Sequence, residues 1–116
     1  MVITDTVSRL GYGQTRVTLE PSGEIDAGSV DQLEGMVHDA LRSGAHEVDV
    51  DLRAVTFMDT TAVRVLQQAR EVLNSNGGYL CLRNPQPQVR QLLRLTALCP
   101  GPAGEPDIAD LMAGGG

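Results

Sequence analysis

An aspartate and two threonines, Asp59-Thr60-Thr61, stand between a β-type run and a segment with strong helical periodicity. This order places a carboxylate and two hydroxyl groups at the N-terminus of a helix. Backbone N–H groups there lack helical partners and the helix dipole favours negative charge, so a phosphate group is well accommodated. The three residues alone are more often an ordinary helix N-cap, but they also offer hydroxyl groups for phosphorylation.

A second acidic pattern, Asp49 and Asp51, is similar to the nucleophile motif of haloacid-dehalogenase-type phosphatases. The pattern departs from that motif because Arg53 stands where threonine or valine belongs, and the chain contains no lysine. Strict alternation over residues 47–52 predicts an amphipathic strand instead, with the acids on one face and apolar residues on the other. A small phosphatase that uses Asp49 or Asp51 is therefore kept only as a remote alternative.

The remaining reactive residues form no recognisable catalytic or metal-binding set. His38 and His46 have no cysteine or carboxylate at ligand spacing, and the absence of lysine excludes a P-loop and a Schiff-base lysine. Cys81 and Cys99 are too few for a disulfide framework. A redox bridge between them is a subordinate hypothesis, which requires Cα atoms within about 7 Å of each other. We expect no catalytic residues, no metal and no cofactor.

Length and composition indicate one globular domain. The 116 residues carry a net charge of −6 and only 3% aromatic residues, which argues against nucleic-acid binding. No apolar run reaches the roughly 18 residues of a membrane span, and no signal peptide is evident, so we expect a cytoplasmic protein. Residues 1–116 are predicted to be a single domain with its core at about 14–98, followed by a loop and a short helical tail at 99–116.

Periodicity predicts helices at 29–42, 61–74 and 87–98. Ser29 is the expected N-cap of the first helix. The expected buried stripe of the second helix is Ala62, Val65, Leu66, Ala69, Val72 and Leu73.

Strands are predicted at 14–20, 47–52 and 79–83, with Pro21 ending the first and a short return at 24–27 forming a hairpin with it. The alternating order of strands and helices predicts an α/β fold, a mixed and mainly parallel sheet of four or five strands with helices on one face. The acids in 47–52 indicate that the other face is at least partly exposed to water.

From about Val17 to Leu98 the sequence resembles the STAS domain family, of the anti-sigma-factor antagonist type. Asp59-Thr60-Thr61-Ala62 corresponds to the family's Asp-Ser-Ser-Gly. The other matching segments, in order, are Gly23-Glu24-Ile25-Asp26, Val50-Asp51-Leu52, Val55-Thr56-Phe57-Met58, Leu82-Arg83-Asn84-Pro85 and residues 89–98.

The resemblance implies a bacterial regulator of transcription by partner switching, not an enzyme. Family members capture an anti-sigma factor that is also a serine/threonine kinase. This kinase phosphorylates the first hydroxyl residue after the aspartate, and a PP2C-type phosphatase reverses the reaction. By position, Thr60 is the acceptor and Thr61 the second candidate, while Asp26, Asp59 and Arg64 join them in the partner-binding surface. Within the family, a non-phosphorylated scaffold or the STAS subunit of a lipid transporter is the alternative, and homodimer formation stays open.

Overall fold

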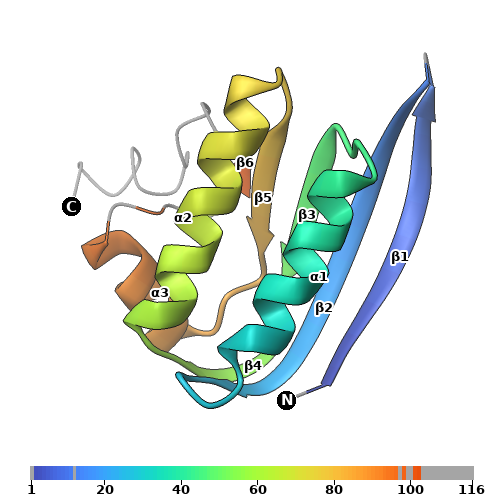
Figure 1. The fold of residues 1–116 in the computed structure, drawn as a ribbon. Coiled ribbons are helices and arrows are strands. Elements are labelled where there is room, and N and C mark those ends of the chain that lie inside the picture. The colour runs from blue at the N-terminus through green and yellow to red at the C-terminus, as the bar shows by residue number, and fades with distance from the viewer. Residues whose placement is uncertain (1, 12, 97, 99–100, 103–116) are drawn as a thin grey trace.

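The computed structural model describes residues 2–11, 13–96, 98 and 101–102 (Figure 1). Its elements, in chain order, are β1 (Val2–Gly11), β2 (Gln14–Ile25), α1 (Val30–Arg42), β3 (Glu47–Asp51), β4 (Ala54–Met58), α2 (Thr60–Ser75), β5 (Tyr79–Arg83), α3 (Pro87–Leu95) and β6 (Gly101–Pro102). Cys99, the tail at 107–112 and the terminal glycines lie outside the described residues, so the predictions made for them are not addressed.

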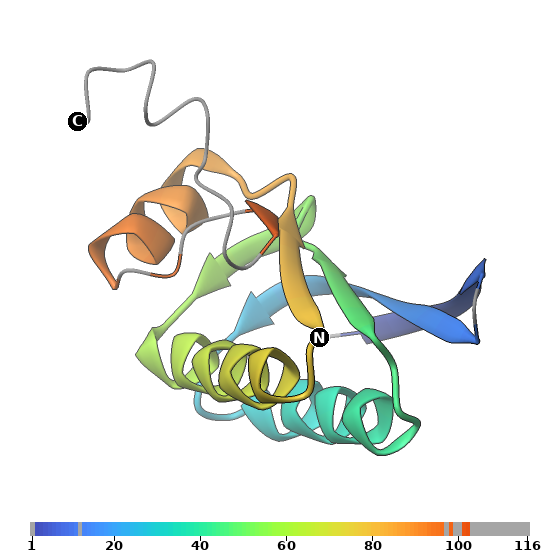
Figure 2. The ribbon, with the colours of Figure 1, turned by 90° about the horizontal axis from the view of Figure 1, so that it is seen from above.

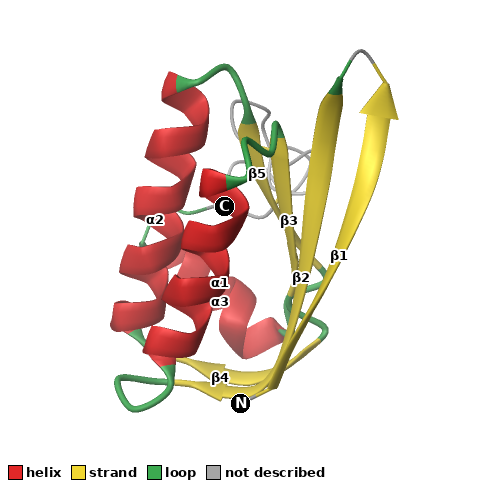
Figure 3. Cartoon of the chain, turned by 45° about the vertical axis from the view of Figure 1, so that its right-hand side comes forward, coloured by secondary structure: helices red, strands yellow, loops and turns green. Residues whose placement is uncertain are grey.

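The described strands form one mixed sheet of six strands, in the order β1-β2-β3-β5-β6, with β4 pairing with β2 off this path. The pairs β2–β3, β2–β4 and β3–β5 are parallel, whereas β1 and β6 pair antiparallel with their neighbours. All three helices lie on one face of the sheet (Figure 3). The predicted α/β class, a mainly parallel sheet with helices on one face, is confirmed. The described sheet has six strands and not the expected four or five, because β1 was not predicted and β6 lies within the segment expected to be a loop.

The N-terminal part of the sheet differs from the prediction. Strand β2 runs for 12 residues through Pro21, and its hairpin partner is β1, not residues 24–27. Pro21 is tolerated because β2 changes partner there: its pairs with β3 end at Leu19 and its pairs with β4 begin at Ser22. A proline between the two ladders removes no hydrogen bond from either parallel pairing.

The helices begin and end close to the predicted positions, but two details differ. Helix α3 ends at Leu95 and not at residue 98, because Thr96 caps it and Leu98 turns back into the core, where its N–H donates to the Leu93 carbonyl at 2.8 Å. On α2, Val72 is 45% exposed although the pattern placed it inside, and Val63 is buried in its stead. The core between sheet and helices is otherwise aliphatic, as expected.

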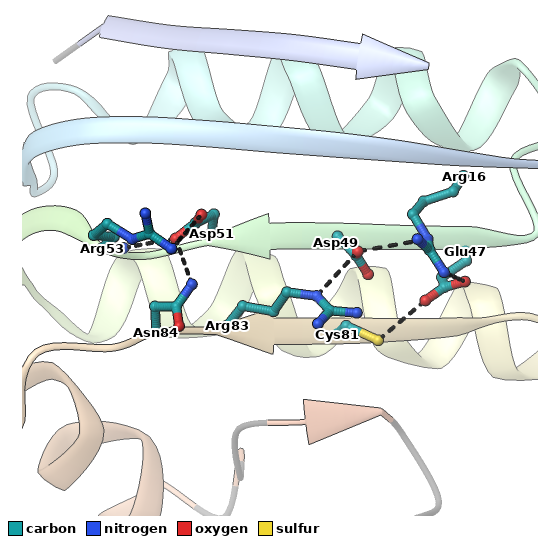
Figure 4. A network of polar contacts seen from close by, with 8 residues as sticks. All are labelled: Arg16, Glu47, Asp49, Asp51, Arg53, Cys81, Arg83 and Asn84. Carbon is teal, nitrogen blue, oxygen red and sulfur yellow. Dashed lines mark hydrogen bonds and ion pairs between the residues drawn. The ribbon is translucent and has the colours of Figure 1, made fainter. Parts of the chain in front are cut away.

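The sheet face away from the helices holds an ion cluster in which two buried acids, Glu47 and Asp49, are paired with the partly exposed Arg16 and Arg83 (Figure 4). Arg16 Nη2 lies 3.0 Å from Glu47 Oε2, and Arg83 Nε lies 3.1 Å from Asp49 Oδ2. Glu47 and Asp49 are only 2% and 3% exposed. Arginines from β2 and β5 therefore cover Glu47 and Asp49, whereas Asp51 is only half-buried, so water reaches this face in part, as expected.

Cys81 extends this ion cluster. Its buried Sγ donates to Glu47 Oε1 at 3.3 Å, and burial raises the pKa of the thiol far above its ordinary range. Burial opposes ionisation of Glu47, but hydrogen bonds from Arg16 and Cys81 outweigh it, so the pKa of Glu47 lies below its ordinary value. The cluster therefore holds a neutral thiol beside an anionic carboxylate at neutral pH.

The first prediction concerns the arginine that neutralises this cluster. Arg16→Met leaves Glu47 and Asp49 undercompensated and is expected to lower the free energy of unfolding by about 2 kcal/mol, less than for a fully buried pair because Arg16 is a third exposed. Arg53→Met is the matched control: its side chain is 75% exposed and 3.9 Å from Asp51, so a change within about 0.5 kcal/mol is expected. Equal effects in urea denaturation would contradict the account.

The second prediction is a pH dependence. Since the pKa of Glu47 is lowered in the folded state, its stabilising contribution is present above the ordinary glutamate pKa and is lost as pH falls through the folded-state value. The stability difference between the wild type and Glu47→Gln should therefore be largest at neutral pH and shrink in acid. Urea unfolding over a pH series measures it, and a difference that stays constant would contradict the assigned contacts.

Candidate functional site

Two loops meet where the parallel strands β2 and β4 end. Ile25 and Met58 are paired as the last residues of these strands, so Asp26 and Asp59 follow at the same edge of the sheet. The Asp59 N–H donates to the Ile25 carbonyl at 3.1 Å, and the backbone of Ala27 also hydrogen-bonds to Asp59. The parallel pairing thus brings together two aspartates that are 33 positions apart in the sequence.

Asp59 is the N-cap of α2. Its backbone is extended, and its Oδ1 accepts hydrogen bonds from the N–H groups of Thr61 at 3.0 Å and Ala62 at 3.3 Å. The Thr61 hydroxyl also donates to this oxygen. This hydroxyl, followed by the two backbone N–H groups, lowers the pKa of Asp59. The N-cap interpretation therefore describes Asp59 and Thr61 correctly.

Thr60 differs from Thr61 in both exposure and contacts. It is the first residue of α2 and is exposed, and within the part of the chain that the structure describes its hydroxyl has no hydrogen-bond partner. Thr61 is half-buried and its hydroxyl is occupied by Asp59. The structure thus separates the two hydroxyls into one that is available and one that supports the helix cap.

The loop that carries Asp26 is held by its own side chains. Asp26 Oδ1 accepts from the Gly28 N–H at 3.0 Å and from the Ser29 hydroxyl at 3.1 Å, and this hydroxyl also donates to the Glu24 carbonyl at 2.9 Å. Ser29 occupies the N-cap position of α1, but its side chain bonds no helical N–H. Ser29 therefore does not cap α1 with its side chain as expected. Its hydroxyl instead stabilises the loop, in which Asp26 is half-buried.

Two further residues flank the site. Arg64 is exposed one turn after Thr60, as its sequence position implies. Phe57, the single phenylalanine of the chain, is 47% exposed beside Glu24, and sequence reasoning did not assign it a role. The register shift opposite Gly23 and Glu24 breaks the alternation of β4 and turns Phe57 outward.

Ala62 stands where the family motif has glycine. Its side chain is fully buried in the core, so the additional methyl group does not alter the surface around Thr60.

The acids considered for phosphatase chemistry lie elsewhere and are engaged. Asp49 is buried between Arg16 and Arg83, and Asp51 accepts from the Arg53 N–H and the Asn84 amide. This arrangement offers no accessible nucleophile at Asp49.

Glu47, Asp49 and Cys81 place possible metal-ligand atoms within 4.8 Å of one another. Arginine nitrogens 3.0 to 3.5 Å from the two carboxylates already supply the positive charge, and the thiol would have to lose its proton. These residues therefore do not fit a metal site. Among the described residues, no helix is long and apolar enough to cross a membrane.

The third prediction tests the cap. Asp59→Ala removes three hydrogen bonds at the start of α2 and should cost about 1 kcal/mol of unfolding free energy. Thr60→Ala, one residue later, removes an exposed hydroxyl without a partner in the described structure and should change it by less than about 0.5 kcal/mol. Thermal or urea denaturation distinguishes the two variants, and an unchanged stability of Asp59→Ala would refute the capping role.

Comparisons with known proteins match the fold as a whole. The anti-sigma-B factor antagonist of Staphylococcus epidermidis is 29% identical over 76 residues, which make up 66% of this chain and 70% of that protein. The crystal structure of an anti-sigma factor antagonist from Mycobacterium paratuberculosis is 28% identical with a TM-score of 0.64, covering 84% of this chain and 80% of that chain.

The fold also matches SpoIIAA, an anti-sigma factor antagonist and cell fate determinant of Bacillus. Its unphosphorylated form gives a TM-score of 0.70 at 21% identity over 96% of this chain and 97% of that chain. Its phosphorylated form gives 0.63 at 21% identity over 82% and 85%. The family model described as the STAS domain matches residues 7–110, and the chain therefore belongs to the STAS domain family.

Proposed function

We propose that this protein is an anti-sigma-factor antagonist whose unphosphorylated form binds a kinase-type anti-sigma factor in the cytoplasm of a bacterium and is released by phosphorylation of Thr60. One observation carries the proposal: the Thr60 hydroxyl is exposed and has no partner in the described structure, and it stands in the family's acceptor position beside the Asp59 cap. The protein regulates transcription through this partner and needs no catalytic residues of its own. A PP2C-type phosphatase restores the binding form.

The contacts favour Thr60 over Thr61 as the acceptor. A kinase needs a hydroxyl that can enter its active site, and the Thr61 hydroxyl is tied to Asp59 inside the cap. Phosphorylation of Thr61 would place two anionic groups against each other and break the bonds that begin α2. Phosphorylation of Thr60 leaves those bonds intact, since the helix N-terminus accepts negative charge.

A phosphate on Thr60 opposes partner binding by charge and size. It adds about −1.5 to −2 charges at neutral pH to an edge that already carries Asp26 and the ionised Asp59. A partner that fits the unmodified surface would then have to remove water from the phosphate without offering it a positive charge in return. Phe57 offers the exposed apolar contact that such a surface needs.

The relatives support the same reading. SpoIIAA has been solved in both phosphorylated and unphosphorylated forms, and the staphylococcal relative is named an antagonist of the anti-sigma-B factor. Within the family, a non-phosphorylated scaffold or a lipid-transporter subunit is the competing function, and the experiment below separates it from the switch.

The fourth prediction compares three variants. Thr60→Glu should bind the anti-sigma kinase of the same organism about tenfold or more weakly, because a fixed charge enters the contact. Thr60→Ala should bind like the wild type but resist inactivation by ATP, while Thr61→Ala should still be inactivated. Calorimetric titration with each anti-sigma kinase of that organism, with and without ATP, measures this. If Thr60→Glu binds as tightly as the wild type and ATP changes nothing, the scaffold or transporter function replaces the switch.

The fifth prediction concerns Arg64. At one turn from Thr60 its guanidinium can pair with a phosphate there, and an exposed pair of this kind contributes less than about 1 kcal/mol. Arg64→Ala should therefore leave the melting temperature nearly unchanged but alter the rate at which a PP2C-type phosphatase removes the phosphate. Arg70→Ala, farther along α2, is the control. A large loss of stability in Arg64→Ala would show that this side chain is structural instead.

A further inference from the structure

Strand β1 is an open edge of the described sheet. It is hydrogen-bonded to β2 on one side, and it is the outermost strand in the strand order, as Figures 1 and 2 show. It pairs regularly from Val2 to Arg9, and eight of its ten residues are exposed. Natural edge strands are usually short or protected by charged side chains, proline or a bulge. Strand β1 is ten residues long, has no lysine or proline, and carries only Asp5 and Arg9 as charged residues.

Helix α1 covers β1 only in part: Ile3 packs against the core, but Val7 is exposed. Val7 lies opposite Val17 and Asp5 lies opposite Leu19, and paired residues of antiparallel strands point to the same face of a sheet. Val17 is 5% exposed, but Val7 is 65% exposed. A hollow lined by Asp5, Val7 and Met36 separates the strand from α1. At Val7 the apolar face of the sheet therefore continues onto β1 without a helix over it.

Asp5 and Arg9 stand on this same face with Val7 between them. They are four residues apart, about 13 Å along an extended strand, which is too far for a pair within β1. Neither side chain has an ion-pair partner among the described residues. The strand thus carries one free negative and one free positive charge, placed symmetrically about an exposed valine.

This pattern is complementary to itself. In an antiparallel pairing of two β1 strands about a two-fold axis at Val7, the two valines face each other and Asp5 of each copy faces Arg9 of the other. Successive side chains of a strand point to opposite faces of the sheet. The register between the two β1 strands can therefore change only in ways that keep residues of the same face opposite each other. An axis at Thr6 sets Asp5 against valine, and an axis at Asp5 sets two aspartates against each other. Only the axis at Val7 pairs all the charges.

We propose that β1 is a dimerisation strand: two copies of this chain join antiparallel along β1, about a two-fold axis at Val7, into one continuous sheet. The interface is isologous, so each copy supplies the same strand. On the opposite face, the hydroxyls of Thr6 and Ser8 lie across from each other in this register. The contact involves none of the residues around Thr60, so it does not depend on the phosphorylation switch.

Charge exchange tests the pairing. Asp5→Arg and Arg9→Asp should each weaken the dimer about tenfold, because each variant faces two like-charge pairs. The double variant Asp5→Arg/Arg9→Asp should restore it, since the charges are exchanged and remain opposite. Glu71→Arg, an exposed reversal on α2, is the control and should leave the dimer unchanged. Sedimentation velocity over a dilution series measures the association, and circular dichroism verifies that each variant is folded.

Cross-linking tests the register. Residues that face each other across antiparallel strands have Cα atoms about 4.5 to 5.5 Å apart, which suits a disulfide. In a Cys99→Ser background, Val7→Cys should give a covalent dimer under mild oxidation, whereas Val2→Cys, equally exposed on the same strand, should not. A wild type that stays monomeric at millimolar concentration overturns the proposal. A dimer that survives both single charge reversals, or that cross-links equally at both positions, overturns it too.

Discussion

The pairing of one side of β2 with two successive strands, β3 and then β4, is the constraint on which the rest of the structure depends. The first half of β2 pairs with β3 and the second half with β4, and Pro21 lies at the change. Only this exchange brings the end of β4 beside the end of β2. The backbone bond from Asp59 to Ile25 then fixes where α2 begins, and the Asp59 cap fixes which threonine hydroxyl is free.

The two faces of the sheet are stabilised by different physics. The helix side is an aliphatic core in which Leu19, Val50 and Leu66 are fully buried. On the other side, Glu47 and Asp49 of β3 are buried against arginines from β2 and β5. Burial of charge is costly unless it is paired, so this face is stable only while the three strands keep their register. The ion pairs therefore stabilise the same strand register as the backbone hydrogen bonds of the sheet.

Features that depend on one segment of the chain could be predicted from the sequence, whereas contacts between distant segments could not. The Asp59 cap and the three helices follow from residue type and periodicity within one segment. The burial of Glu47 and Asp49 depends on Arg16 and Arg83, each 31 or more residues from its partner, so the alternating pattern of β3 alone did not reveal it.

Strand β1 and Phe57 escaped prediction for related reasons. Strand β1 is exposed on both faces, so it lacks the alternation that marks a half-buried strand. The outward turn of Phe57 accompanies an extra residue in β4 where it pairs with β2, and residues 54–58 alone do not reveal this pairing. The position of Thr60 was predictable from the family motif, but its difference from Thr61 required the hydrogen bonds of the folded chain.

The central claim is that Thr60 is the hydroxyl that the partner kinase modifies. The direct measurement is peptide mapping by mass spectrometry after incubation of the wild-type protein with each anti-sigma kinase of its organism and ATP. The account predicts one phosphate per chain, on Thr60, with Thr61 unmodified because its hydroxyl is held by Asp59. A phosphate on Thr61 alone, or no phosphate with any of these kinases, would contradict it.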